Sequence, residues 1–181
     1  MPMMKLLPIL IVLPGFALLG CEDQQSDPSL ETVKKFYSSR IESQANGMPS
    51  LSEISQMAPY ISKELRALLD AASAEYAGSS TKSASEEKIE DGDWFTSMFN
   101  GPTSFIVGEV QSSGTKHIVS VRFTSAQQLP AVNWRDRIVV IEEEGHHVIA
   151  NVEYENHWAF QDNTTLVDVL KDPKARRKHP S

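Results

Sequence analysis

The feature that most constrains the fold is an alternation of apolar and polar residues between Lys116 and Ser125. Val119, Val121 and Phe123 fall on one side of an extended chain there, and mostly polar residues fall on the other. Side chains on a β-strand point alternately to its two faces, so the pattern predicts a strand with one buried face. A sheet made of such strands needs a second layer to cover its apolar face.

Strand composition recurs in segments 105–111, 134–143 and 146–154. Short turns at 112–114 and 144–145 separate consecutive strands, which is typical of an antiparallel meander. In the last strand, the residues expected to share one face are Val148, Ala150, Val152 and Tyr154.

Two longer segments before the strands repeat apolar residues at helical spacing. The first helix is expected to be capped by Asp27-Pro28 or Ser29, and the second to be capped by Ser62 and to end at Gly78. Shorter helical segments are expected at 51–57 and 165–171. Helices followed by about four strands predict an α+β fold with the N-terminal helices packed on one face of an antiparallel sheet. The expected apolar stripes are Leu30, Val33, Tyr37 and Ile41 in the first helix and Leu65, Leu68, Leu69, Ala72 and Tyr76 in the second.

Residues 1–20 have the pattern of a signal peptide. A positive charge at Lys5 precedes an almost wholly apolar run from Leu6 to Leu19, and the chain turns polar at Glu22. This run is shorter than the roughly 20 residues that span a bilayer as a helix. We therefore expect a segment that directs export and is then removed.

The only cysteine of the chain follows this segment directly, in the sequence Leu18-Leu19-Gly20-Cys21. The sequence resembles the bacterial lipobox, which implies cleavage after Gly20, a diacylglycerol on the Cys21 thiol and an acylated amino terminus. Several acyl chains on one residue make a durable membrane anchor. The alternative is a secreted protein with a chance cysteine near the cleavage site. The chain then divides into a lipidated tether (21–29), an α+β domain (30–172) and a basic tail (173–181).

Charge narrows the class of partner. The formal net charge is -7 and the sequence pI is near 5.2, which argues against a nucleic-acid partner. The basic tail either contacts anionic lipid or is solvated. In lipoproteins an Asp after the lipidated cysteine favours retention in the inner membrane, and Glu22 stands there instead. We therefore expect the outer membrane, with the domain facing the periplasm.

Three groups of motifs resemble the YbjP-type envelope lipoproteins, whose domain has no known function. They are Phe36-Tyr37 with Arg40-Ile41, the segment 59–62 with the leucines after it, and the hairpin 136–154. The resemblance covers roughly 30–154. It implies a fold like that of nuclear transport factor 2, in which a strongly curved sheet wraps on helices to form a cone. The long polar loop 79–93 departs from the pattern. The fold itself hosts enzymes, carriers and binding modules.

The candidate pocket residues of such a cone suit packing and hydrogen bonding better than proton abstraction. No catalytic, nucleotide-binding or cofactor-binding motif accompanies them, so we expect a protein that is not an enzyme and holds no cofactor. The candidates are Tyr37, Arg40, Tyr60, Trp94 and Tyr154.

Several charged and aromatic residues have two interpretations. Arg40 is expected either to form a buried ion pair, with Asp136 or Glu153, or to bind an anion at the cone mouth. Asp91 and Asp93 are expected to be solvated. The aromatic cluster within 94–99 either closes one end of the core or docks a partner.

The histidines do not predict a metal site. His146 and His147 are neighbours on an expected strand and so point to opposite faces. His117 and His157 lie elsewhere in the sequence. No cysteine remains as a ligand once Cys21 carries lipid.

The sequence thus predicts a lipid-anchored periplasmic module that supports another envelope protein, such as an outer-membrane assembly. An immunity-type protein that blocks a periplasmic toxin is a special case. The alternative is a carrier of a small apolar or anionic ligand. The oligomeric state stays open.

Overall fold

The computed structural model describes residues 27–80, 92–156 and 165–172. The signal peptide, most of the tether, Asp91, His157 and the basic tail lie outside the described residues. The first helix begins at Pro28, so Pro28 and Ser29, predicted to belong to the tether, form its first turn. In chain order the elements are α1 (Pro28–Glu42), α2 (Leu51–Met57), α3 (Lys63–Ser80), β1 (Ser104–Ser113), β2 (Lys116–Ser125), β3 (Val132–Glu143), β4 (His146–Tyr154) and α4 (Leu166–Lys171).

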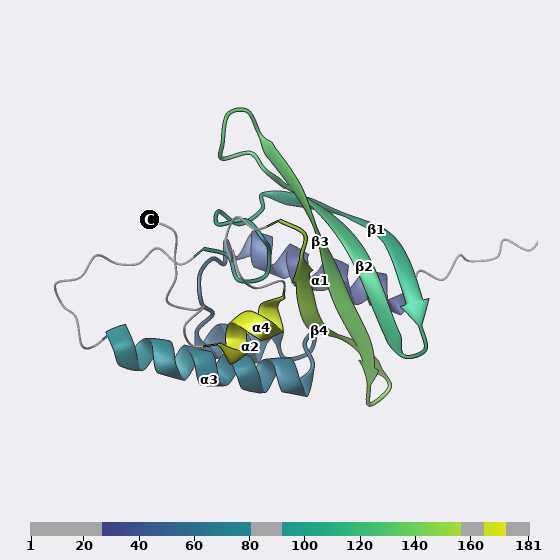
Figure 1. The fold of residues 1–181 in the computed structure, drawn as a ribbon, viewed down its shortest axis with the longest axis horizontal. Coiled ribbons are helices and arrows are strands. Elements are labelled where there is room, and N and C mark those ends of the chain that lie inside the picture. The colour runs from purple at the N-terminus through teal and green to yellow at the C-terminus, as the bar shows by residue number, and fades with distance from the viewer. Residues whose placement is uncertain (1–26, 81–91, 157–164, 173–181) are drawn as a thin grey trace, which may run out of the picture.

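The four strands form a curved, unclosed antiparallel sheet in the order β1-β2-β3-β4 (Figure 1). Each strand pairs with the next one along the chain, as in a meander. The tight turns at both hairpins contain a glycine with positive φ, Gly114 at 61° and Gly145 at 77°, a conformation that side chains with a Cβ disfavour. The predicted α+β fold with helices first and a four-stranded antiparallel sheet after them is confirmed.

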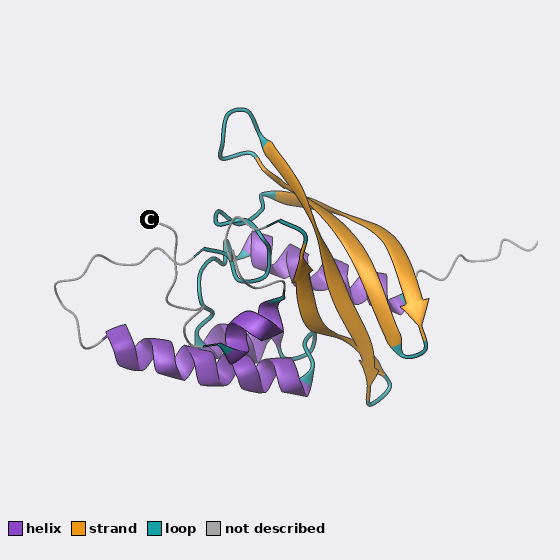
Figure 2. Ribbon diagram, viewed as in Figure 1, coloured by secondary structure: helices purple, strands orange, loops and turns teal. Residues whose placement is uncertain are grey.

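The core lies between the sheet and the helices (Figure 2). On β2, Val119, Val121 and Phe123 are fully buried, as the alternation predicted. α1 lies across the sheet and contributes Val33, Phe36 and Tyr37. α3 and α4 pack against β4, and α2 packs against α3. The space between sheet and helices is therefore largely occupied by the chain's own side chains.

The predicted phase of β4 is wrong in its first half. Ile149, Val152 and Tyr154 face the core, whereas Ala150, which was predicted to do so, is only partly buried. The pairing of β3 with β4 shifts between Val139 and Val140, as in a β-bulge. An extra residue on one strand inverts the alternation on one side of the bulge, and no pattern of period two anticipates it.

Two helix beginnings follow the predicted caps. Asp27 accepts from the Ser29 backbone N–H at 2.9 Å, and the Ser62 hydroxyl accepts from Leu65 N at 3.1 Å. The reciprocal capping box that Ser50 and Glu53 form on α2 was not predicted. Each cap satisfies an N–H group that a helix leaves without an internal partner. The sequence therefore located these helix starts well.

The end of α3 differs from the prediction. The helix continues past Gly78 to Ser80, and Tyr76, which was placed on the apolar stripe, is 41% exposed. The last turns of α3 extend beyond the body of the molecule, where no layer covers them (Figure 1). A Cβ on Gly78 would meet nothing within 4 Å, so no neighbour compels the helix to end there.

Candidate functional site

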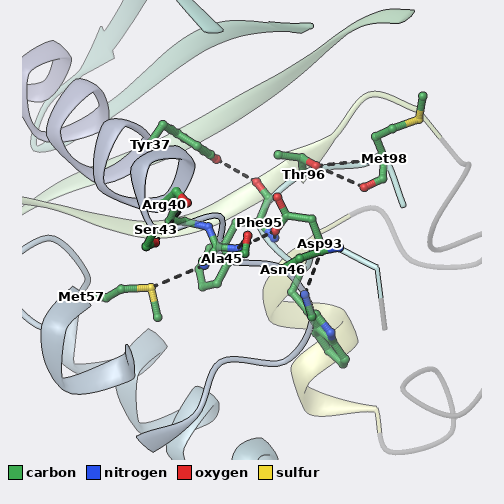
Figure 3. Close-up of polar contacts among 12 residues, drawn as sticks. Tyr37, Arg40, Ser43, Ala45, Asn46, Met57, Asp93, Phe95, Thr96 and Met98 are labelled. Carbon is green, nitrogen blue, oxygen red and sulfur yellow. Dashed lines mark hydrogen bonds and ion pairs between the residues drawn. The ribbon is translucent and has the colours of Figure 1, made fainter. Parts of the chain in front are cut away.

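The site is built around an irregular segment, 92–99, that is almost wholly buried although it belongs to no helix or strand. Buried backbone of this kind lacks the hydrogen bonds that helices and sheets supply internally. Its polar groups must therefore find partners on other elements. Side chains from α1, β3 and β4 provide them. Figure 3 shows one of these, Tyr37 of α1, pointing to Phe95.

Two tyrosines hold the backbone of this segment from opposite sides. The Tyr37 hydroxyl on α1 donates to the Phe95 carbonyl at 2.8 Å, and the Tyr154 hydroxyl on β4 donates to the Trp94 carbonyl at 2.6 Å. Burial raises the pKa of both tyrosines well above their ordinary value, so both phenols stay protonated and able to donate.

Asp136 on β3 fastens the segment to the sheet. Its Oδ2 accepts from Ser97 N at 2.8 Å, and its Oδ1 accepts from Glu155 N at 3.0 Å. Burial raises the pKa of this carboxyl to about 6, although the hydrogen bonds from Ser97 and Glu155 oppose the rise. A carboxyl group in this position changes charge close to neutral pH.

Arg40 and Asp93 form an ion pair inside the protein, with 2.7 Å between Arg40 Nη2 and Asp93 Oδ1. The guanidinium also lies over the Phe95 ring, 4.3 Å from its centre, and Asp93 accepts from Phe95 N at 3.0 Å. Arg40 is 6% exposed and Asp93 2% exposed. A buried ion pair was predicted for Arg40, but the expected partners Asp136 and Glu153 are wrong.

The expectation that Asp93 is solvated is also wrong. The polar composition of the preceding residues suggested an exposed loop, but Gly92 and Asp93 are both buried. A Cβ on Gly92 would come within 2.8 Å of the Phe99 ring and 3.0 Å of the Phe99 backbone. The missing Cβ at Gly92 thus permits the close return of the chain that brings Asp93 inside.

The aromatic cluster closes one end of the core. Trp94, Phe95 and Met98 are buried, and Phe95 stacks edge-on against Phe36 with ring centres 5.2 Å apart. Of the two interpretations of the cluster, core closure therefore fits its position. Since these side chains are buried, they offer no contact surface to a partner.

A cavity of about 470 Å³ opens beside the ion pair. Arg40 and Asp93 line it together with Tyr37, and its other polar lining includes the amides of Gln44, Asn46 and Gln127 and the hydroxyl of Thr103. A volume of this size suits a small organic molecule. Its lining pairs one cation with one anion and is otherwise uncharged, which favours a neutral or zwitterionic polar ligand.

The five candidate pocket residues are only partly brought together. Tyr37 and Arg40 line the cavity, whereas Trp94 and Tyr154 are buried in the core beneath it. Tyr60 packs at the edge of the core, where its carbonyl accepts from Ile149 N at 2.7 Å. The candidate pocket residues did not include Asp93, Asp136 or the cavity amides. No local sequence pattern predicts that these side chains lie at or near a pocket.

Two of the histidines lie close together in the structure. The rings of His117 on β2 and His147 on β4 lie 5.1 Å apart, across the intervening strand. Within the described residues, no group of three or more His, Cys, Asp or Glu side chains is placed to hold a metal ion. No helix in that same part of the chain has the length and apolar character to cross a membrane.

Comparison of the chain with models of protein families, with curated proteins and with solved structures found no match. The relationship to YbjP-type lipoproteins and the likeness to nuclear transport factor 2 therefore stay predictions. Inference of function depends on the residues and their geometry.

The buried ion pair supports a prediction about stability. Arg40→Met leaves the Asp93 carboxylate buried without its cation, which is expected to lower the free energy of unfolding by about 3–5 kcal/mol. Adding Asp93→Asn should restore part of this loss. Arg66→Met, which removes an exposed arginine 3.8 Å from Asp70, should change stability by no more than about 1 kcal/mol. Urea denaturation measures the free energy of unfolding of the native protein and of each variant. Equal effects of Arg40→Met and Arg66→Met would contradict the structural role of the pair.

Asp136 supports a prediction about pH. Its pKa in the folded protein, about 6, lies above the ordinary value of 3.8, so the folded state binds more protons between these values. Its contribution to stability is therefore complete below pH 3.8 and is lost as the pH rises through 6. Relative to Asp136→Asn, the native protein should lose up to about 3 kcal/mol of unfolding free energy between pH 4 and pH 7. A difference between the two proteins that does not change with pH would refute this.

Proposed function

We propose that the chain is a lipid-anchored binding module of the bacterial cell envelope, held through Cys21 and acting through a protein partner. The observation that carries the proposal is the lipobox-like sequence ending at Cys21, placed only a few residues ahead of a folded domain. The described domain has a filled core and a buried tyrosine network, and the charged pair that lines its cavity is tied up in structural contacts. These features support a binding role more than an enzymatic one.

The spacing between anchor and domain limits how the domain sits. Five residues lie between Cys21 and Asp27, the N-cap of α1, and the six steps from one Cα to the next span at most about 20 Å. The start of α1 lies beside the β3–β4 hairpin, because Thr32 Oγ1 donates to the His147 carbonyl at 2.9 Å. An anchored domain therefore holds this end near the bilayer and leaves the β2–β3 connection as the remote end.

The location that we propose is the periplasmic face of the outer membrane. Glu22 rather than Asp follows the lipidated cysteine, and the motifs resemble envelope lipoproteins of the YbjP type. The partner that we propose is another envelope protein, such as an outer-membrane assembly. An immunity-type role against a periplasmic toxin would use the same anchored position.

The anchor is tested by Cys21→Ser. Removal of the thiol that carries the diacylglycerol should move the protein from the membrane pellet to the soluble periplasmic fraction and abolish incorporation of labelled palmitate. A Ser26→Ala variant, which changes a hydroxyl outside the lipobox, should stay in the pellet and keep the label. A Cys21→Ser protein that remains membrane-bound would refute the anchor.

The cavity favours a second candidate function, a carrier of a small polar ligand. Arg40 and Asp93 are held in fixed positions by Phe95, so a ligand would meet preorganised polar groups. The opening between α1 and the residues around Thr103 gives it a route of entry. This candidate and a protein partner do not exclude each other.

Native mass spectrometry tests the carrier. The Cys21→Ser protein purified from the periplasm should carry a bound small molecule. Ala45→Phe, which fills the cavity, should remove it, and Ala67→Phe, at an exposed position on α3, should not. A native protein that is free of ligand, with a spectrum unchanged in Ala45→Phe, would contradict this function.

A further inference from the structure

The sheet face opposite the helices carries an unusual row of residues. Ile106 on β1, Arg122 on β2 and Arg135 on β3 are direct cross-strand neighbours, and we call these three residues the arginine row. All three are exposed, Ile106 by 65%. Their neighbours along each strand, such as Val121 and Asp136, point to the core, which confirms that the row faces outward.

The two arginines lie directly opposite each other on neighbouring strands. Like charges directly opposite on neighbouring strands destabilise a sheet. On the same face, the charge of Arg137 is balanced by an ion pair with Glu153. A second cation, Lys116, has its Nζ 3.9 Å from Oε1 of the same Glu153. Among the residues that the structure describes, no carboxylate forms an ion pair with Arg122 or Arg135. In a chain with a net charge of -7, these two neighbouring arginines make a local cationic surface.

Exposed apolar side chains accompany the arginines. Ile106 continues the row, and Leu129, in the β2–β3 connection at the same end of the sheet, is 98% exposed. Arginine with exposed apolar side chains is the composition of a protein-binding surface, where guanidinium groups and apolar contacts supply much of the affinity. Free phosphate or another small anion would leave Ile106 and Leu129 without a function.

The position of the row favours a protein over a lipid surface. Arg135 precedes Glu143, beside the β3–β4 turn, by eight residues, about 26 Å along an extended strand. The anchored start of α1 lies at that turn, on the far side from the row. If Cys21 holds the domain as proposed above, the row faces away from the bilayer that carries the anchor.

We propose that the arginine row binds an acidic segment of another envelope protein. Carboxylates of the partner bridge Arg122 and Arg135, and an apolar side chain beside them covers Ile106. The proposal deepens the function given above, and it rests on that function for the location of the partner. The binding chemistry itself does not need the anchor.

Purified protein tests the chemistry apart from the anchor. The Cys21→Ser chain is titrated into a fluorescent peptide rich in Glu and Asp with interspersed Leu, and binding is followed by anisotropy. We expect salt-sensitive binding that weakens at least about tenfold in Arg122→Gln/Arg135→Gln. The control Lys35→Gln/Arg66→Gln removes the same charge from exposed helical positions and should bind as the native protein does. Absent binding, or equal loss in both double variants, would overturn the proposal.

The variants are not expected to unfold. Removing two like charges that face each other should leave the melting temperature unchanged or slightly higher. Vesicles that contain phosphatidylglycerol are the second probe in the same assay. Arginine-dependent binding to these vesicles in preference to the peptide would identify a lipid and overturn the protein partner.

A photo-crosslinking amino acid at Ser104, exposed beside Ile106, tests the full-length chain in cells. Crosslinks should map to an acidic segment of a protein and disappear in Arg122→Gln/Arg135→Gln, while the variant stays in the membrane pellet. Crosslinks that persist in this variant would refute the arginine row. If the native protein is found in the soluble fraction and still shows crosslinks that depend on the two arginines, the lipid anchor is refuted. The proposed binding by the arginine row then stands.

Discussion

The structure depends on hydrogen bonds to one buried segment of irregular backbone, 92–99. Peptide groups removed from water cost free energy unless they are paired, and this segment has no helix or sheet neighbour of its own to pair them. Tyr37, Tyr154 and Asp136 supply the missing partners from three different elements. The ion pair of Arg40 with Asp93 adds a charged link. Together they join α1 to the sheet through the segment that lies between them.

The same network shapes the cavity. Arg40 and Asp93 belong both to the core and to the cavity wall, so the polar groups that a ligand would meet are held by structural bonds. Asp136 is buried and holds the backbone of the same segment at Ser97. The pKa of its carboxyl is about 6. The stability of the segment behind the cavity is therefore linked to pH near 6. The groups that stabilise the core here also form the cavity wall.

The two ends of the sheet present different chemistry. The end with the β3–β4 turn lies beside the start of α1, where the lipid anchor would hold it. The remote end combines the cavity, through Thr103 and Gln127, with the arginine row on the outer face. If the anchor is as proposed, the polar cavity and the cationic arginine row lie at the end of the domain that is remote from the bilayer. This arrangement gives the proposed partner a definite side of approach.

The sequence by itself determined the order of elements, the helix caps at Asp27 and Ser62 and the buried face of β2, because these depend on local periodicity and on side chains a few residues apart. The lipobox-like site at Cys21 stays a prediction from the sequence. Only the tertiary structure decided the partner of Arg40, since Asp93 is 53 residues away and lies next to a polar stretch that suggested solvent. It likewise decided the β4 bulge and the pairing of Arg122 with Arg135, because strand register is a property of two strands and cannot be read from either one.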